Sequence, residues 1–469
     1  MVTRLSASDA SFYHLENTST PMYVGTLSIL RKPRNGLSYE AFLATVEQRL
    51  PQIPRYRQKV RELAVGLARP VWIDDREFDI TYHIRRSALP SPGSDAQLHE
   101  LIARLGPRPL DKSRPLWEMY LIEGLAKNRV AIYTKTHQAL VNGMTALEIG
   151  HVIADRTPKA PEFGEDIWIP AREPSDTRLL IGAVGDWVGA PRAQLGAVRS
   201  AVAEVATNAG ALVEVGRRFA DVARTFARGT APNSPLNTTV SRNRRLAVAS
   251  HRLDDYRSLR ARYDCDVNDV VLAVVTGALR NWLLSRGEPV TTTTTVRAMA
   301  PMSVYPDAEL DAGGPGQAIS EVSPFLVDMP VGEGNAVVRL SQIAHATESH
   351  STAASLVDAR TIVTLSGFAP PTLHAMGTRV ATSFSARQFN LLITNVPGAQ
   401  RQMYVAGTKL LETYSVPPLL NKQVLAIGVT SYNGMLYFGV NADRDAMSDV
   451  DMLPSLLRES LDELLEAAQ

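Results

Sequence analysis

One heptapeptide of this chain carries residue types suited to moving a proton while a hydroxyl group reacts. Its sequence is His137-Gln138-Ala139-Leu140-Val141-Asn142-Gly143. An imidazole such as that of His137 ionises near neutral pH and can act as a general base. The carboxamide of Gln138 donates and accepts hydrogen bonds but takes up no proton at neutral pH. The pattern therefore indicates a catalytic segment in which only one of two adjacent polar residues is basic.

The heptapeptide lies between two predicted elements. A strand-like run covers residues 129–133, and a helix-like run covers residues 145–154. Because neighbouring residues on a strand point to opposite faces, His137 and Gln138 would not point in one direction. His137 therefore has two interpretations. It is either a base turned inward by a bulge at the strand end, or a structural imidazole held by hydrogen bonds.

Four further segments place polar or aromatic residues beside an element end or a turn. They are 114–118 (Arg-Pro-Leu-Trp-Glu), 268–273 (Asn-Asp-Val-Val-Leu-Ala), 392–398 (Leu-Ile-Thr-Asn-Val-Pro-Gly) and 431–434 (Ser-Tyr-Asn-Gly). Each has an ordinary explanation when taken singly. Asn268 suits a helix N-cap, Trp117 a core aromatic, and Pro397-Gly398 a tight turn. Only the ordered set is specific.

As an ordered set, these segments resemble the bacterial wax ester synthase/diacylglycerol O-acyltransferase family. The heptapeptide resembles that family's H-H-x-x-x-D-G motif, in which the second histidine takes the proton of the attacking hydroxyl. The resemblance covers nearly the whole chain, from Leu5-Ser6 and Thr20-Pro21-Met22 to Phe438-Gly439 and Asp443.

The resemblance implies an α/β (α+β) fold of two chloramphenicol-acetyltransferase-like domains, each a mixed sheet flanked by helices, with a tunnel between them. It also implies the reaction. A fatty acyl group would pass from acyl-CoA to diacylglycerol, which yields triacylglycerol, or to a long-chain alcohol, which yields a wax ester. Acyl-CoA is then a substrate, and neither a metal nor another cofactor is expected.

The same resemblance assigns roles to individual residues. Gln138 and His137 stand at the catalytic positions, with Asn142 and Gly143 as support within the motif. Asn268, Asp269 and Asn395 are expected to line the tunnel from the second domain, and Pro115, Leu116 and Trp117 to position the substrate.

The motif is degenerate at two positions. Gln138 replaces the proton acceptor, and loss of a general base costs roughly 10² to 10⁴ in rate. Asn142 replaces an aspartate, so charge-assisted hydrogen bonds there become neutral ones. Tyr305 and Gln317 stand where the family usually has arginine and asparagine.

Three functions compete on this basis. An O-acyltransferase is favoured by the retained segments. A catalytically impaired member that binds acyl-CoA or neutral lipid, or that supports an active paralogue, is favoured by Gln138. An enzyme acting on small polar acceptors is the weakest of the three.

Composition narrows the class of protein further. The 469 residues are 45% hydrophobic and 21% charged, with a net charge of +1, which gives no case for a nucleic-acid partner. The single cysteine, Cys265, forms no internal disulfide and suits a reducing cytoplasm. The longest apolar run, 270–284, is interrupted by Arg280 and Asn281, so any membrane contact is expected to be peripheral.

The chain is long enough for two domains. We expect an acyltransferase-like domain over 1–175, a helical connector over 176–243 and a second acyltransferase-like domain over 244–469. Residues 177–245 carry ten arginines against four acidic residues. Such a basic amphipathic stretch has two interpretations, a helical connector with solvated arginines or a segment that docks on a membrane or lipid droplet.

Overall fold

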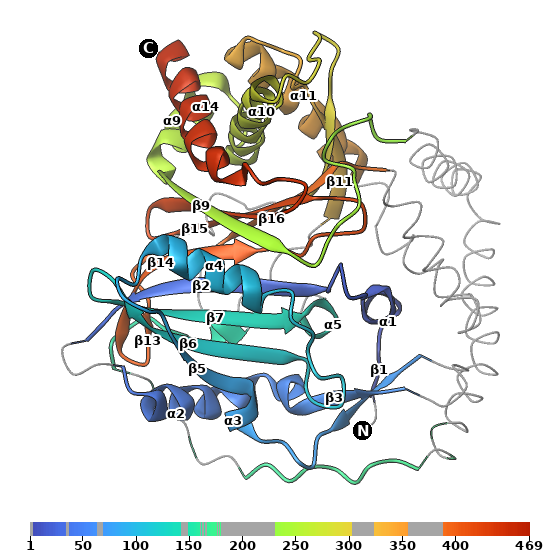
Figure 1. Cartoon of the computed structure of the whole chain (residues 1–469), viewed down its shortest axis with the longest axis vertical. Helices are drawn as coiled ribbons and strands as arrows, with labels where there is room; N and C mark the ends of the chain where they lie inside the picture. Colours follow the sequence, from blue (N-terminus) through green and yellow to red (C-terminus); the bar gives the residue numbers. More distant parts are fainter. Residues whose placement is uncertain are drawn as a thin grey trace, which may run out of the picture.

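The computed structural model describes residues 3–33, 37–62, 69–141, 149–159, 161, 164, 167–175, 177, 179, 230–302, 323–354 and 388–469. Within these ranges the chain forms two halves stacked on one another, each with a sheet and flanking helices (Figure 1). The predicted mixed α/β architecture is therefore confirmed.

The first half alternates helices and strands. Its elements are β1 (Thr3–Arg4), α1 (Ala7–Leu15), β2 (Tyr23–Arg31), α2 (Tyr39–Arg49), β3 (Gln58–Arg61), β4 (Val71–Asp74), α3 (Ile80–His83), β5 (Ile84–Ala88), α4 (Asp95–Leu105), β6 (Trp117–Leu125), β7 (Arg129–His137), α5 (Gln138–Val141), α6 (Ile149–Val152) and β8 (Ala154–Asp155), with short 3-10 turns at Leu50–Gln52 and Pro54–Arg57.

Local capping chemistry sets where the helices of this half begin. The Ser38 hydroxyl accepts the Ala41 N–H at the start of α2. Ser94 and Gln97 form a capping box that opens α4, each side chain bonding the other's backbone N–H. Both helices begin where these caps lie, because each cap is encoded within a few residues of the sequence.

The seven-stranded sheet of the first half contains a segment from far along the chain. Its order is β5-β6-β7-β2-β14-β13-β8, in which β13 (Tyr404–Val405) and β14 (Thr408–Val416) come from the second half. β14 pairs antiparallel with β2, from Val416↔Gly25 to Leu410↔Leu30. The sequence analysis assigned all of 244–469 to the second domain, and this segment departs from that assignment. It covers what would be an open edge of β2.

The second half contains a six-stranded mixed sheet. Its elements are β9 (Arg244–Arg252), α9 (Leu253–Tyr263), α10 (Val267–Ser285), β10 (Val296–Met302), β11 (Ser323–Met329), α11 (Ala336–Ala354), β12 (Leu391–Pro397), β15 (Leu425–Tyr432), β16 (Met435–Asp443), a 3-10 turn (Val450–Met452) and α14 (Leu453–Ala467). The order is β11-β10-β12-β15-β16-β9, and β12 runs parallel to both β10 and β15.

α10 forms the centre of the second half. It is long and apolar enough to cross a bilayer, the one such helix among the described residues, but 72% of its apolar window is buried inside the protein. Figure 1 shows it surrounded by α9, α11 and α14. α10 is therefore a core helix.

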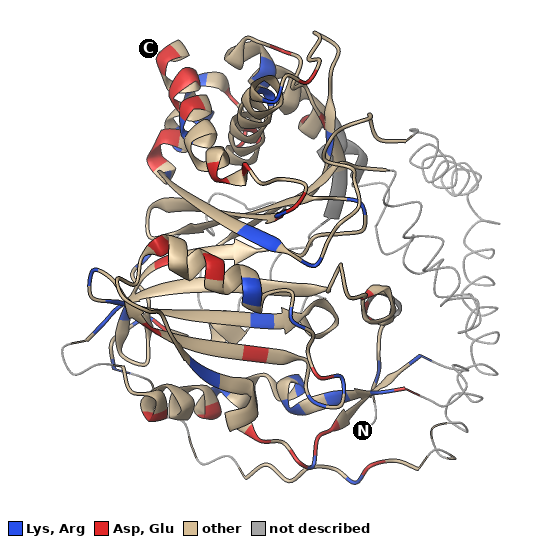
Figure 2. Cartoon of the chain, in the orientation of Figure 1, with Lys and Arg blue, Asp and Glu red and all other residues tan. Residues whose placement is uncertain are grey.

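Figure 2 shows basic and acidic residues interspersed over the helices and loops of both halves, with acidic residues prominent on α14. The predicted connector over 176–243 and its arginines lie mostly outside the described residues.

Candidate functional site

The junction between β7 and α5 is fixed by backbone hydrogen bonds from both sides. The His137 N–H donates to the Leu116 carbonyl at 2.9 Å, and the Gln138 N–H donates to the Met22 carbonyl at 2.8 Å. Tyr23 on β2 is the cross-strand partner of His137. Two segments of the first half, one with Leu116 and one with Met22 and Tyr23, thus hold the place where the heptapeptide begins.

The His137 ring is fully buried and oriented by hydrogen bonding. The Ala139 N–H donates to its Nδ1 at 3.0 Å, so the neutral ring carries its proton on Nε2. Burial lowers the pKa of the imidazole to about 4; Glu16 opposes this shift, and Lys112 adds to it. Because Nδ1 is occupied and the ring resists protonation, this geometry matches the structural interpretation of His137 and not an inward-facing base.

Two charged residues complete the surroundings of that ring. Nε2 of His137 lies 3.7 Å from Oε2 of Glu16, the C-cap residue of α1. Lys112 Nζ lies 2.9 Å from the same carboxylate oxygen. The sequence analysis missed both residues, because Glu16 and Lys112 are far from the heptapeptide in the chain and belong to no local pattern.

Gln138 is the first residue of α5 and is partly buried. Its backbone N–H is bonded to the carbonyl of Met22, the residue before β2. The carboxamide is therefore the part of the residue suited to bind a hydroxyl group. Asn142 and Gly143, which the sequence analysis assigned to support of the motif, lie outside the described residues.

The segment Pro115-Leu116-Trp117 is buried in the core of the first half. Trp117 donates its Nε1–H to the Tyr56 carbonyl at 2.8 Å and stacks on His83, with ring centroids 4.6 Å apart. The sequence analysis assigned this segment to substrate positioning. Trp117 packs in the core, and the Leu116 carbonyl accepts the His137 N–H at the β7–α5 junction, while a role of the segment in substrate positioning stays a prediction.

Asn268 and Asn395 meet in the second half. The amide of Asn395 on β12 donates to the amide oxygen of Asn268, in the first turn of α10, at 2.5 Å. These residues belong to two of the segments that the sequence singled out. Their contact therefore joins the sheet to the central helix.

Asp269, the third residue assigned to the tunnel, has both carboxylate oxygens occupied. One accepts the Asp266 N–H at 2.8 Å in a capping box, and the other accepts the Thr347 hydroxyl at 2.6 Å. Burial raises the pKa of this carboxyl group, while the two hydrogen bonds lower it. Asp269 anchors α10 to α11.

A small, partly open cavity of about 30 Å³ lies between the two halves. It is lined by Pro21, Tyr23, Ile102, Ala103, Gly106, Pro107, Tyr133, Arg244, Leu246, Val416, Pro418, Leu419 and Asn441. Tyr23 belongs to the cavity wall, and its ring lies 5.9 Å from that of His137. The cavity therefore adjoins the heptapeptide, whereas Asn268, Asp269, Asn395 and Trp117 are not among its described lining residues.

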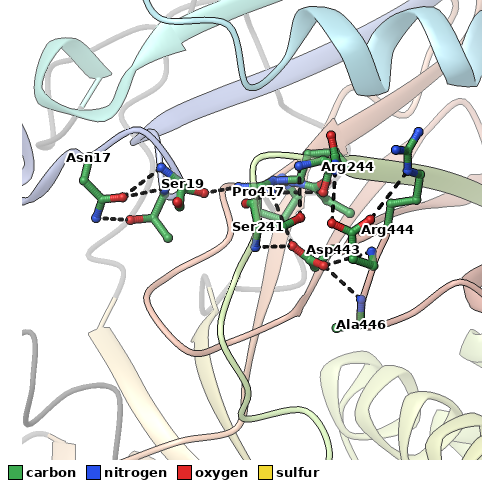
Figure 3. A network of polar contacts seen from close by, with 12 residues as sticks. Asn17, Ser19, Ser241, Arg244, Pro417, Asp443, Arg444 and Ala446 are labelled. Carbon is green, nitrogen blue, oxygen red and sulfur yellow. Dashed lines mark hydrogen bonds and ion pairs between the residues drawn. The ribbon is translucent and has the colours of Figure 1, made fainter.

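A polar network joins the halves beside this cavity (Figure 3). Arg244 on β9 donates to the Ser241 carbonyl at 2.7 Å and to the Ser19 carbonyl of the first half. Asp443, fully buried, accepts the N–H groups of Ser241, Asp445 and Ala446 and lies 3.7 Å from Arg244. The network fixes the loop after α1 against the second half.

Metal and thiol chemistry find no support among the described residues. Those ranges contain no group of three His, Cys, Asp or Glu side chains placed to hold a metal ion. Burial raises the pKa of the Cys265 thiol to about 12, so it is protonated at neutral pH.

Comparison with protein families gives two matches that together span most of the chain. The model of the wax ester synthase/diacylglycerol acyltransferase catalytic domain matches residues 5–271. The model of the C-terminal domain of the same proteins matches residues 321–465.

Individual relatives agree with these matches. A protein of Mycobacterium tuberculosis named "probable diacylglycerol O-acyltransferase" is 76% identical over 57% of this chain and 98% of its own length. A second protein of that species with the same description is 31% identical over 98% of both chains.

Solved structures extend the similarity to the fold. The wax ester synthase/diacylglycerol acyltransferase from Marinobacter aquaeolei VT8 superposes with a TM-score of 0.69 at 25% identity, over 99% of both chains. The first condensation domain of the calcium-dependent antibiotic synthetase superposes with a TM-score of 0.60 at 13% identity, which shows the fold alone. The predicted pair of acyltransferase-like sheets is therefore confirmed.

Proposed function

We propose a function from one premise: this chain belongs to the wax ester synthase/diacylglycerol acyltransferase family. It moves a fatty acyl group from acyl-CoA to diacylglycerol or to a long-chain alcohol, and the transfer takes place at the junction of β7 and α5. The observation that carries the proposal is the fixed position of the β7–α5 junction, where α5 begins with Gln138, next to Tyr23, which lines the small cavity shared by the two halves. Both substrates carry long apolar chains, which require a site shielded from water.

The reaction balances without a cofactor. The acceptor oxygen attacks the thioester carbonyl, a C–O bond forms, the C–S bond breaks, and the hydroxyl proton ends on the sulfur of free coenzyme A. In our proposal the Gln138 carboxamide orients the hydroxyl through hydrogen bonds and does not remove its proton. Positioning and electrostatic stabilisation then supply the rate enhancement.

The alternative of an impaired member, which only binds lipid or supports an active paralogue, gains no support from the comparisons, since the relatives are described as acyltransferases. We further propose that the protein acts in the cytoplasm and touches a membrane or lipid droplet peripherally. The ten arginines within 177–245 and the water-insoluble acceptor support this placement.

The experiment compares product formation from labelled palmitoyl-CoA and diacylglycerol by the wild type, Gln138→His, Gln138→Ala and His137→Ala. We expect the wild type to form more product than a heat-inactivated control, and Gln138→Ala to form less product than the wild type. Gln138→His restores a base and should raise the rate about 10²-fold over the wild type. No product from the wild type, combined with strong activity of Gln138→His, would overturn the proposal. A wild type that turns over while only His137→Ala is inactive would instead assign the base to His137.

A further inference from the structure

The proton on Nε2 of His137 needs an acceptor that the described part of the heptapeptide, residues 137–141, does not supply. Nδ1 is taken by the Ala139 N–H at 3.0 Å, so the neutral ring has its N–H group at Nε2. Nε2 is buried and makes no hydrogen bond within the described residues. A buried N–H without an acceptor costs about 1–3 kcal/mol.

Glu16 is placed to be that acceptor. Its Oε2 is buried and lies 3.7 Å from Nε2, and the same oxygen pairs with Lys112 Nζ at 2.9 Å. Approach by roughly 0.5–1 Å would bring the two atoms within hydrogen-bond range. The two atoms therefore complement each other across the junction of α1 and α5.

Lys112 anchors the Glu16 carboxylate to α1. Lys112 Nζ lies 2.9 Å from Oε2 and also stands 4.3 Å from the Tyr13 ring centroid. Lys112 further donates to the Tyr13 carbonyl at 3.4 Å, so the ammonium is fixed to α1, the helix that Glu16 ends. An anchored anion is a stronger acceptor than a neutral group.

The chain of contacts ends at the reactive junction. Glu16 directs the His137 proton to Nε2, Nδ1 accepts the Ala139 N–H, and that bond closes the first turn of α5 on Gln138. Figure 1 shows α1 beside α5. On the other side of Glu16, the Asn17 side chain accepts the N–H groups of Ser19 and Thr20, so the loop after α1 is itself ordered.

We propose that Glu16 is a positioning residue for acyl transfer, which holds the Nε2–H tautomer of His137 and through it the turn that presents Gln138. The family matches assign no role to Glu16. The inference rests on the proposed function for its kinetic consequence, but the tautomer of His137 can be measured independently of activity.

The first measurement is ¹⁵N NMR of the imidazoles in full-length protein labelled at histidine, with the His137 signals identified by their loss in His137→Phe. We expect the wild type at pH 7 to show protonated Nε2 and unprotonated Nδ1. In Glu16→Met, which keeps the side-chain length but lacks an acceptor, the Nδ1–H tautomer gains population. Glu16→Gln, which keeps an oxygen acceptor, retains the wild-type tautomer.

The second measurement is steady-state kinetics on the same proteins. We expect Glu16→Met to lower kcat by up to about 10²-fold with little change in KM for palmitoyl-CoA, and Glu16→Gln to recover most of kcat. The matched control is Glu123→Gln, which breaks the ion pair of Glu123 with Arg86 at the far end of β6 and leaves tautomer and kcat unchanged.

The outcomes separate the two proposals. A wild-type His137 protonated on Nδ1, or a tautomer and kcat that are unchanged in Glu16→Met, overturns the role of Glu16. Absence of product from every protein, including the wild type, counts against the proposed function, while the NMR spectra still decide whether Glu16 sets the tautomer. If Glu16→Met fails to fold, Glu16→Leu, which also lacks an acceptor, takes its place in both measurements.

Discussion

The amide nitrogen of Asn395 lies 2.5 Å from the amide oxygen of Asn268, and this hydrogen bond ties β12 to the first turn of α10. Asn395 is buried, so its amide has little access to water in the folded state. Removal of one partner leaves a polar atom of the other without its bond, which costs more than loss of the bond itself.

We therefore predict that Asn395→Ala lowers the free energy of unfolding by about 1–3 kcal/mol. The double variant Asn268→Ala/Asn395→Ala should lose less than the sum of the two single variants, with a coupling of at least about 0.5 kcal/mol. Urea unfolding followed by tryptophan fluorescence measures all four proteins. Strictly additive losses would show that the two amides do not stabilise the fold together.

A second prediction concerns stability against pH. Burial lowers the pKa of the His83, His137 and His251 imidazoles to about 4 each. An unfolded histidine titrates near 6.5, so the unfolded chain binds more protons than the folded one between these values. The free energy of unfolding therefore has its full value above pH 6.5. It falls as the pH is lowered toward 4, and at pH 5 the loss is about 2 kcal/mol per imidazole.

The urea midpoint at pH 7, 6 and 5 checks this prediction, in a range where most carboxylates stay charged. His251→Gln should flatten the decrease, because one of the three buried imidazoles is removed. His345→Gln alters an exposed histidine of α11 and should leave the pH dependence unchanged. A midpoint that does not move from pH 7 to pH 5 would contradict the assignment of neutral buried rings.

The sequence predicted those parts of the structure whose interacting residues lie close together along the chain. The start of α4 was predictable because Ser94 and Gln97 encode it within one turn. The insertion of β14 beside β2 was not predictable from the sequence. An alternating apolar pattern indicates that a segment forms a strand, but it does not indicate which sheet the strand joins. The partition at residue 244 therefore missed a strand that crosses between the halves.

The candidate site shows the same limit. The heptapeptide located the junction of β7 and α5. The resemblance singled out Asn268 and Asn395 as residues expected to line the tunnel, and their contact with each other is seen only in the structure. Asp269 was expected to line the tunnel. Its spacing from Asp266 is that of a capping box, and this local signal was already present in the sequence. Glu16 carried no such signal, since its relation to His137 exists only after α1 packs beside α5.

A third prediction concerns the network that joins the halves. Arg244 is buried, and burial lowers its guanidinium pKa to about 10 although Asp443 raises it. Arg244→Met would leave the buried Asp443 carboxylate without its cation and the Ser19 carbonyl without its donor. We expect a loss of about 3 kcal/mol in the free energy of unfolding.

The neighbouring residue provides the control for this prediction. Arg245 pairs with Asp451, and both side chains are largely exposed, at 40% and 55%. Arg245→Met should therefore cost less than about 1 kcal/mol, since exposed ion pairs are screened by water. Thermal unfolding of both variants gives the comparison, and equal losses would show that the buried network does not hold the halves together.

The last prediction decides between packing and substrate positioning for Trp117. Trp117→Phe removes the Nε1–H bond to the Tyr56 carbonyl and leaves space in the core, so we expect a loss of about 2–4 kcal/mol in stability. The same change at Trp282, which donates to Asp449 at 3.0 Å in the other half, is the matched control and should destabilise to a similar extent. Below the unfolding transition, kcat/KM for palmitoyl-CoA should stay within about twofold of the wild type in both variants, because a core residue acts on the folded population and not on the bound substrate. A tenfold rise in KM confined to Trp117→Phe, with stability unchanged, would instead place this ring against the substrate.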